Sequence, residues 1–370
     1  RYTPYQPNSA ALAAGTGTGD SCSSYGNRNF YNLFTEWFGS TQSYEVHGGI
    51  LDGYNDAGGS RILGYPTMNE SCGLKDNGCY QTFQNGVIYW TPPLGSHTVM
   101  NGAIHNRWLA LGLEWSILGY PTSNQLSTKD NGLFQQFENG GIYYSPSTGA
   151  YENYGGIRET YSSMGFENSF LGYPIGQVGC GLIENGCYQH YQGGSIYWTP
   201  NYSGMVIYGA IRDKWFQLGY ENSAVGYPTG VEYCYNEANC YRDFESGSIY
   251  WYNGGVSYAN WGEIAIKYRS IGRNQTFMGY PTMDQQCGLI NNGCYQTLQY
   301  GNGTIYYSPS TGVHTLYGGI KAKWLETGYE WGNLGYPTSD EIPTGGNNTK
   351  QTFERGIIYW TNGVASVQYY

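Results

Sequence analysis

The tetrapeptide Leu63-Gly64-Tyr65-Pro66 recurs along the chain with only its first residue varying. The copies read LGYP, LGYP, LGYP, VGYP, MGYP and LGYP, at residues 63–66, 118–121, 171–174, 225–228, 278–281 and 334–337. Consecutive copies are 53 to 56 residues apart. A nearly fixed period of this length predicts a repeat protein that uses one structural unit six times.

Other residues recur in step with the tetrapeptide. A G-x-I pattern precedes each copy, and an aromatic residue follows the Ile by four positions: Tyr54, Trp108, Tyr161, Trp215, Tyr268 and Trp324. This spacing places the two side chains one helical turn apart and predicts a short helix that ends at Gly. After the tetrapeptide, a segment such as CYQTFQNGVIYW (residues 79–90) predicts a β-hairpin with Asn85-Gly86 as its turn.

The two ends of the chain cover overlapping parts of the repeat. Residues 37–50 align with residues 144–157, and residues 360–370 cover the same part of the unit. This overlap favours a ring whose last blade receives strands from both termini, whereas an open array, the alternative, would need polar caps. We therefore expect an all-β fold, a closed β-propeller of about six LGYP-type repeats with short helical turns. Residues 1–43 would form an N-terminal arm and closing strand, and residues 44–370 the propeller.

The composition excludes several classes of partner. Charged residues make up 12% of the chain, about half the usual share, and the net charge is −10. Binding to nucleic acid through phosphates needs clustered Lys and Arg, which are absent. No apolar run approaches the roughly 20 residues that span a bilayer, and the chain opens at Arg1 without an apolar signal segment, as expected of a processed, mature form. No nucleotide-binding or zinc-protease motif is present, so we expect neither a cofactor nor a metal.

The cysteines indicate the compartment. Eight of the nine form close pairs: Cys72 and Cys79, Cys180 and Cys187, Cys234 and Cys240, and Cys287 and Cys294. Structural zinc sites usually have two to four residues between paired cysteines, whereas these gaps are five or six, so disulfides across a hairpin fit better than zinc. Disulfides predict a secreted, extracellular protein. Cys22 is left as a free thiol or pairs outside the chain, and five sequons offer glycosylation sites: Asn69, Asn201, Asn274, Asn302 and Asn347.

Together, the tetrapeptide, the G-x-I-x-x-x-W before it and the F-x-x-G-x-I-Y-W after it resemble the LGFP repeat. The resemblance covers roughly residues 44–370, with Tyr replacing Phe in every tetrapeptide, which we interpret as a minor change. LGFP repeats occur in secreted proteins of mycolic-acid bacteria, often beside cell-wall enzymes, and in fungal secreted proteins. The resemblance implies a β-propeller that associates with wall polysaccharide such as peptidoglycan or arabinogalactan. No separate catalytic domain accompanies the repeats, and the sequons and paired cysteines favour a fungal source.

Three functions remain open. The first is a monomeric, lectin-like module that binds polysaccharide or peptidoglycan, with one site per blade or between blades. Its stacking faces would come from Trp37, Trp90, Trp198, Trp251 and Trp360, although the default interpretation of these strand positions is the core. The second is a glycoside hydrolase of the muramidase type, and the third is a purely structural surface protein.

A hydrolase would need two carboxylates that flank the scissile bond. Glu36 aligns with a position that carries Tyr in the repeats, and Asp52 and Asp56 lie where the first repeat departs from the others, so these three are the candidate catalytic residues. Their alternative interpretation is a degenerate terminal copy and a glycine-rich surface loop. His190 and Asp243, which replace a common Thr, are weaker candidates. A Glu shared by four repeats, at 114, 167, 221 and 330, is expected to be structural.

Overall fold

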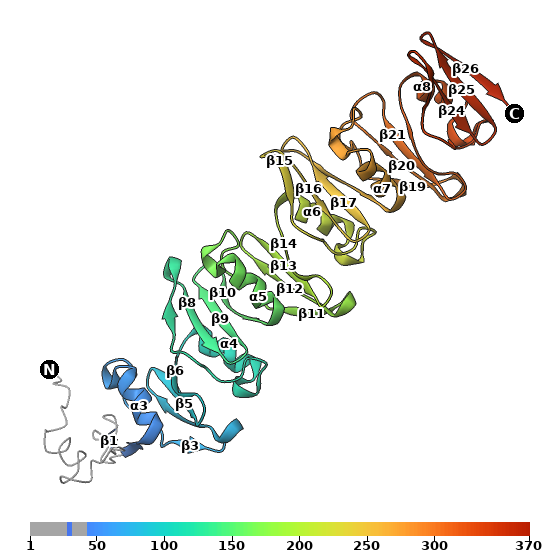
Figure 1. The fold of residues 1–370 in the computed structure, drawn as a ribbon. Coiled ribbons are helices and arrows are strands. Elements are labelled where there is room, and N and C mark those ends of the chain that lie inside the picture. Colours follow the sequence, from blue (N-terminus) through green and yellow to red (C-terminus); the bar gives the residue numbers. More distant parts are fainter. Residues whose placement is uncertain (1–27, 32–42) are drawn as a thin grey trace. The chain divides into compact units, whose positions relative to one another are not determined.

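The computed structural model describes residues 28–31 and 43–370 (Figure 1). The chain divides into two compact units, one formed by residues up to 181 with 186–198 and the other by residues 182–185 with 199–370. Of the helices in the described part of the chain, none combines the length and the apolar character that a membrane span requires.

Six four-stranded antiparallel sheets follow one another along the sequence, and in each the strands pair in chain order. The strands are β3 (Ser71–Cys72), β4 (Cys79–Phe83), β5 (Gly86–Thr91) and β6 (Gly95–Met100); β7 (Leu126–Ser127), β8 (Leu133–Phe137), β9 (Gly140–Ser145) and β10 (Gly149–Tyr154); β11 (Gly179–Leu182), β12 (Gly186–Tyr191), β13 (Gly194–Thr199) and β14 (Ser203–Ile207); β15 (Tyr233–Asn236), β16 (Asn239–Asp243), β17 (Gly247–Trp251) and β18 (Ser257–Trp261); β19 (Gln286–Leu289), β20 (Gly293–Thr297), β21 (Thr304–Ser308) and β22 (Gly312–Leu316); and β23 (Ile342–Gly345), β24 (Asn348–Phe353), β25 (Gly356–Thr361) and β26 (Val364–Tyr369). These six sheets confirm the prediction of one structural unit used six times.

A short helix precedes each sheet, as the G-x-I pattern predicts. The helices are α3 (Gly48–Asp56), α4 (Ala103–Leu111), α5 (Gly155–Met164), α6 (Gly209–Leu218), α7 (Gly262–Ser270) and α8 (Gly318–Glu326). Gly112, Gly165 and Gly219 end three of them in the left-handed conformation, with φ of 105°, 98° and 105°. A 3-10 turn then leads into each tetrapeptide: η2 (Gly59–Arg61), η4 (Leu113–Trp115), η6 (Phe166–Asn168), η8 (Tyr220–Asn222), η9 (Arg273–Gln275) and η11 (Tyr329–Trp331).

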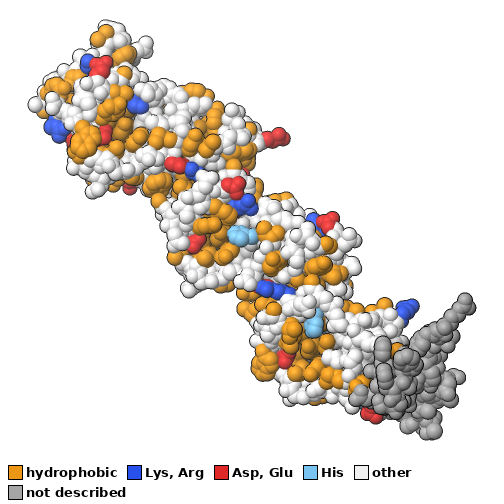
Figure 2. Space-filling model, turned by 180° about the vertical axis from the view of Figure 1, so that it is seen from behind, with side chains coloured by type: hydrophobic (Ala, Val, Ile, Leu, Met, Phe, Trp, Pro, Cys, Tyr) orange, Lys and Arg blue, Asp and Glu red, His pale blue; other side chains and the backbone are white. Residues whose placement is uncertain are grey.

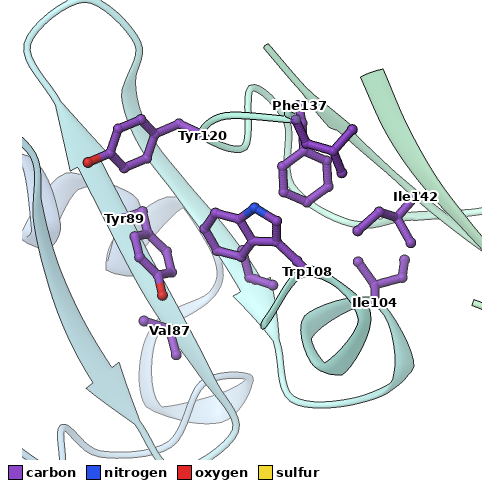
Figure 3. Packing of buried hydrophobic residues seen from close by; sticks show 9 residues of the cluster. Val87, Tyr89, Ile104, Trp108, Tyr120, Phe137 and Ile142 are labelled. Atoms are coloured by element: carbon purple, nitrogen blue, oxygen red, sulfur yellow. The ribbon is translucent and has the colours of Figure 1, made fainter. Parts of the chain in front are cut away.

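The aromatic residue of each helix is the centre of a small core. The indole of Trp108 is fully buried, and Figure 3 shows it beside Tyr89, Tyr120 and Phe137. Its Nε1 donates a hydrogen bond of 3.2 Å to the Gly119 carbonyl of the tetrapeptide. In every other repeat the equivalent Trp Nε1 or Tyr hydroxyl donates to the glycine carbonyl of its own tetrapeptide. Trp and Tyr therefore alternate because both are bulky, apolar and able to donate at that point.

The tyrosine of the tetrapeptide links neighbouring repeats. The Tyr173 hydroxyl donates 2.6 Å to the Lys129 carbonyl of the preceding repeat, and Tyr120, Tyr227 and Tyr336 do the same in theirs. A Cβ added at Gly132 would lie 2.2 Å from the Tyr173 hydroxyl, which explains a glycine at that turn. The interpretation of Tyr for Phe as a minor change is therefore corrected, because phenylalanine could not make this bond.

A fully buried amide forms a second link. In five repeats, Nε2 of the Gln on the second strand donates both to a carbonyl of the preceding repeat and to one in its own loop: Gln81, Gln135, Gln189, Gln296 and Gln351. In the fourth repeat the guanidinium of Arg242 takes this place and donates to the Val206 and Gly230 carbonyls. Buried carbonyls need such partners, so these side chains hold the repeats together.

The hairpin turn differs from the prediction by one residue. Phe83 pairs with Gly86, so Gln84 and Asn85 form the turn and Gly86 begins β5. The backbone N–H groups of Gln84 and Asn85 donate to the carbonyls of Tyr65 and Leu63, so the tetrapeptide itself holds the turn. A Cβ at Gly86 would lie 2.8 Å from the Val99 carbonyl oxygen, so close packing rather than turn geometry requires this glycine.

Four disulfides confirm the predicted cysteine pairing: Cys72–Cys79, Cys180–Cys187, Cys234–Cys240 and Cys287–Cys294. In the second and sixth repeats the equivalent pairs are Ser127 with Leu133 and Pro343 with Thr349, so the bridges are accessory. Glu70 and Glu232 each lie beside one bridge, but disulfide sulfurs offer no thiolate to a metal. The bridges indicate an oxidising, extracellular setting. Cys22 lies outside the described residues.

The described terminal strands do not share a sheet. The strands β1 (Arg28–Tyr31) and β2 (Ser43–Val46) pair with each other, and the sheet β23–β26 takes all four strands from the C-terminal repeat. Within residues 28–31 and 43–370, hydrogen bonds therefore do not show the expected exchange of strands between the ends.

Candidate functional site: clefts between repeats

The first cleft lies between the second sheet and α5 and has a volume of about 580 Å³. Its polar lining includes Gln136, Asn139 and Arg158, and its apolar lining includes Ile117 and Phe166. The second strand of the sheet supplies Gln136, and the first turn of the helix supplies Arg158. The cleft thus lies at the seam between two consecutive repeats.

The second cleft, of about 430 Å³, lies at the equivalent seam between the fifth sheet and α8. Its lining includes Thr297, Asn302, Lys321, Tyr329 and Glu330. Three lining residues occupy the same repeat positions in both clefts. Lys321 and Arg158 each follow the buried Ile of their helix. Thr297 and Gln136 each follow the buried Gln of their strand, and Tyr329 and Phe166 each open their 3-10 turn. Two seams therefore form the same kind of cleft.

Arg158 is held in place from several sides. Its Nη2 donates 2.6 Å to Oε1 of Gln136, and its guanidinium lies 5.6 Å from the ring centre of Phe134 and 5.2 Å from that of Phe166. Contacts of this kind fix a guanidinium while leaving further N–H groups for a ligand. The cleft can therefore offer a preorganised hydrogen-bond donor.

Lys321 is 5% exposed, although it lines the second cleft. Its ammonium donates to the Asn302 carbonyl at 2.8 Å, to Oδ1 of Asn302 at 3.2 Å and to the Thr304 hydroxyl. All three acceptors are neutral, so no negative charge offsets the loss of water. Burial accordingly lowers the pKa of Lys321 from 10.5 to about 8.

This lowered pKa makes stability depend on pH. Between pH 8 and 10.5 the unfolded chain holds the Lys321 proton more tightly than the folded chain, so folding becomes more favourable as pH rises. We expect the wild type to gain about 2 kcal/mol relative to Lys321→Met between pH 7 and 9.5, measured by urea unfolding. Lys323→Met is the matched control, because Lys323 lies on the same helix, is partly exposed and pairs with Glu326. A wild type that gains nothing relative to Lys321→Met would contradict the shift.

The glutamate shared by four repeats is buried, as the sequence predicts. Glu114, Glu167, Glu221 and Glu330 are 4%, 8%, 6% and 8% exposed. Burial and then the charge of Glu330 raise the pKa of Tyr336 to about 12, so its hydroxyl stays protonated and can donate to the preceding repeat. These carboxylates therefore belong to the seam.

The predicted stacking tryptophans are half-buried between helix and sheet. A Cβ added at Gly49, Gly156 or Gly319 would lie 2.2, 2.0 or 2.0 Å from the ring of Trp90, Trp198 or Trp360. Nε1 of Trp251 donates 2.9 Å to the Gly255 carbonyl. These four residues pack within their repeats, and none of them is in the lining of the two clefts. Trp37 lies outside the described residues.

The structure describes two of the three candidate catalytic carboxylates. Asp52 and Asp56 are exposed on α3, which replaces the glycine-rich loop given as the alternative, and their spacing of four residues puts them on one helix face. Glu36 lies outside the described residues. The polar groups of the two weaker candidates already have partners within the protein. His190 Nδ1 is 2.8 Å from the Ser195 hydroxyl, and Asp243 forms a 2.8 Å ion pair with Arg273.

The sequons differ in their surroundings. Four of the asparagines are exposed: Asn69, Asn201, Asn302 and Asn347. Asn274 is half-buried, and its Nδ2, the atom that a glycan would modify, donates 2.8 Å to the Tyr280 hydroxyl. Asn274 is therefore poorly placed for glycosylation.

Two tryptophans were missed by the sequence analysis. Trp115 and Trp331 each end a 3-10 turn and are 72% exposed. In the other repeats a polar residue ends this turn: Arg61, Asn168, Asn222 and Gln275. A search for aromatic residues at positions that are otherwise polar would have found both.

Comparison with known proteins gives one strong result. The model of the LGFP repeat matches residues 63–116, 118–169, 171–223, 225–275, 278–332 and 334–368. No curated protein matches the chain.

Similarities to solved structures are weak. Virginiamycin B lyase from Staphylococcus aureus is 7% identical over 81% of this chain and 83% of its own, with a TM-score of 0.13. A streptogramin B lyase is 10% identical over 81% and 79%, also with a TM-score of 0.13. The hemopexin-fold protein CP4 from cow pea is 14% identical over 50% and 88%, with a TM-score of 0.15.

Proposed function

The chain belongs to the LGFP-repeat family, and on this premise we propose that it binds a microbial cell-wall glycan, peptidoglycan or a related polysaccharide, through the clefts between its repeats. The observation that carries the proposal is the recurrence of one kind of cleft at two seams. A polymer with repeating sugar units suits a protein with repeating sites, because several weak contacts combine into strong retention.

The chemistry of the clefts supports a sugar ligand. Both clefts have volumes within the range of small-molecule sites and combine amide, hydroxyl and charged groups with aromatic side chains. The first contains Arg158 with Glu138 and Glu159, and the second contains Lys321 with Glu330. Charges of both signs suit hydroxyl groups, which both donate and accept hydrogen bonds. A largely neutral polyhydroxyl ligand therefore fits better than a strongly charged one.

The test is cosedimentation of the intact protein with purified insoluble peptidoglycan. We expect the wild type to pellet and Arg158→Ala to pellet less, because one preorganised donor is lost. Arg61→Ala, which removes an exposed arginine of η2 far along the chain from either cleft, is the matched control and should pellet like the wild type. Protein that stays in the supernatant would overturn the proposal.

The same incubation tests the hydrolase alternative. Soluble reducing ends released by the wild type but not by Glu36→Gln would make the protein a muramidase-type enzyme, with Asp52 and Asp56 as the next candidates. No observation on the described residues favours this alternative over binding.

We further propose that the protein is secreted, acts as a monomer and closes its repeats into a ring. The four disulfides and the exposed sequons support secretion. The six blade-like antiparallel sheets support a propeller. Small-angle X-ray scattering tests both the monomer and the ring: a radius of gyration well above about 21 Å, the value for a compact chain of this length, would exclude closure.

A further inference from the structure

Two exposed indoles stand out from the repeat pattern. Trp115 and Trp331 are each 72% exposed, whereas the helix tryptophans Trp108, Trp215 and Trp324 are fully buried. Because four repeats carry Arg, Asn or Gln at the same position, the fold does not need an aromatic residue there. Trp is enriched at intermolecular interfaces because its ring offers a large apolar surface, so these two exposed rings can serve such a contact.

Each of these indoles lies next to one of the clefts. Trp331 directly follows Tyr329 and Glu330, which line the second cleft, in the same 3-10 turn. Trp115 is two residues from Ile117, which lines the first cleft, so the two Cα atoms are at most about 7 Å apart. Each indole therefore lies close in the chain to residues that line a cleft. Figure 2 shows hydrophobic side chains exposed beside polar ones on one face of the molecule.

We propose that Trp115 and Trp331 are rim subsites that stack on a sugar ring next to the one held in the cleft, so that the protein recognises a stretch of neutral polysaccharide rather than a single sugar. This inference rests on the proposed function of the clefts. A pyranose ring presents an apolar C–H face that packs on an indole, while its edge hydroxyls remain in water. The large exposed surface of each indole matches this kind of contact, and the polar lining of the cleft would hold the neighbouring ring.

The experiment compares β-1,4-linked N-acetylglucosamine oligomers of one to six units by isothermal titration calorimetry on the full chain. We expect affinity to rise with oligomer length in the wild type. The double variant Trp115→Asn with Trp331→Gln introduces residue types that other repeats already hold, so it should fold normally. It should lose about tenfold in affinity for the hexamer and leave the affinity for the single sugar unchanged.

A conservative variant separates stacking from other effects. Trp115→Phe with Trp331→Phe keeps a flat ring and should recover most of the hexamer affinity. A hexamer affinity that is unchanged in the double polar variant would overturn the rim subsites while the proposed function stands. A wild type that binds neither oligomer nor peptidoglycan would overturn both.

Discussion

Replacing Gln189 by leucine should lower the free energy of unfolding by about 3–5 kcal/mol. Gln189 is fully buried, and its Nε2 donates 2.7 Å to the Glu152 carbonyl and 2.9 Å to the Gly176 carbonyl. Its Oε1 accepts from Nδ2 of Asn153 at 2.8 Å and from the Tyr191 hydroxyl at 2.9 Å. Leucine has a similar volume but leaves these buried groups without their partner, and each unsatisfied group costs about 1–3 kcal/mol.

The matched control is Gln177→Leu in the same repeat. Gln177 is exposed, and its side chain accepts one hydrogen bond of 3.2 Å from Arg107, so its loss should cost less than about 0.5 kcal/mol. Both variants are measured by urea unfolding, with tryptophan fluorescence as the signal. A loss below about 1 kcal/mol in Gln189→Leu would show that the buried amide does not hold the repeats together.

The contrast between these two glutamines shows what could be predicted from the sequence. Period, helix and hairpin follow from the spacing of Gly, Ile and aromatic residues within one repeat, and the six sheets confirm them. Gln189 and Tyr173 recur equally clearly, but their partners are backbone carbonyls of the preceding repeat. Spacing within a repeat contains no information about which carbonyl of another repeat lies within reach. The links between repeats therefore could not be predicted from the sequence.

The candidate site was predicted less well for a related reason. Arg158 and Lys321 each follow a helix Ile, a position that carries Leu51, His105, Arg212 and Ala265 in other repeats, so the sequence pattern does not mark it as shared. The clefts form only when a helix side chain meets the strand of the preceding sheet. The prediction of sites between blades was nevertheless part of the lectin-like hypothesis, although its residues were placed on the strand tryptophans. The rings of Trp90, Trp198 and Trp360 are half-buried because helix glycines let them pack closely.

Replacing the helix aromatic residue should also lower the free energy of unfolding strongly. The size of the loss should depend on whether the new side chain keeps the hydrogen bond to the tetrapeptide glycine. Trp108→Phe should lower the free energy of unfolding by about 3–5 kcal/mol, because it leaves a cavity and removes the donor to the buried Gly119 carbonyl. Trp108→Tyr should cost about 1–3 kcal/mol less than Trp108→Phe, since Tyr161 and Tyr268 show a tyrosine hydroxyl reaching the equivalent carbonyl at 2.7 and 2.9 Å.

The reciprocal variant isolates the hydroxyl. Tyr161→Phe removes only that group and should cost about 1–3 kcal/mol by urea unfolding, with no added cavity around the ring. Equal losses for Trp108→Phe and Trp108→Tyr, together with a neutral Tyr161→Phe, would mean that the repeat selects its aromatic residue by volume alone. The larger loss for phenylalanine would instead identify the donor as the reason that the helix position alternates between Trp and Tyr and never holds Phe in this chain.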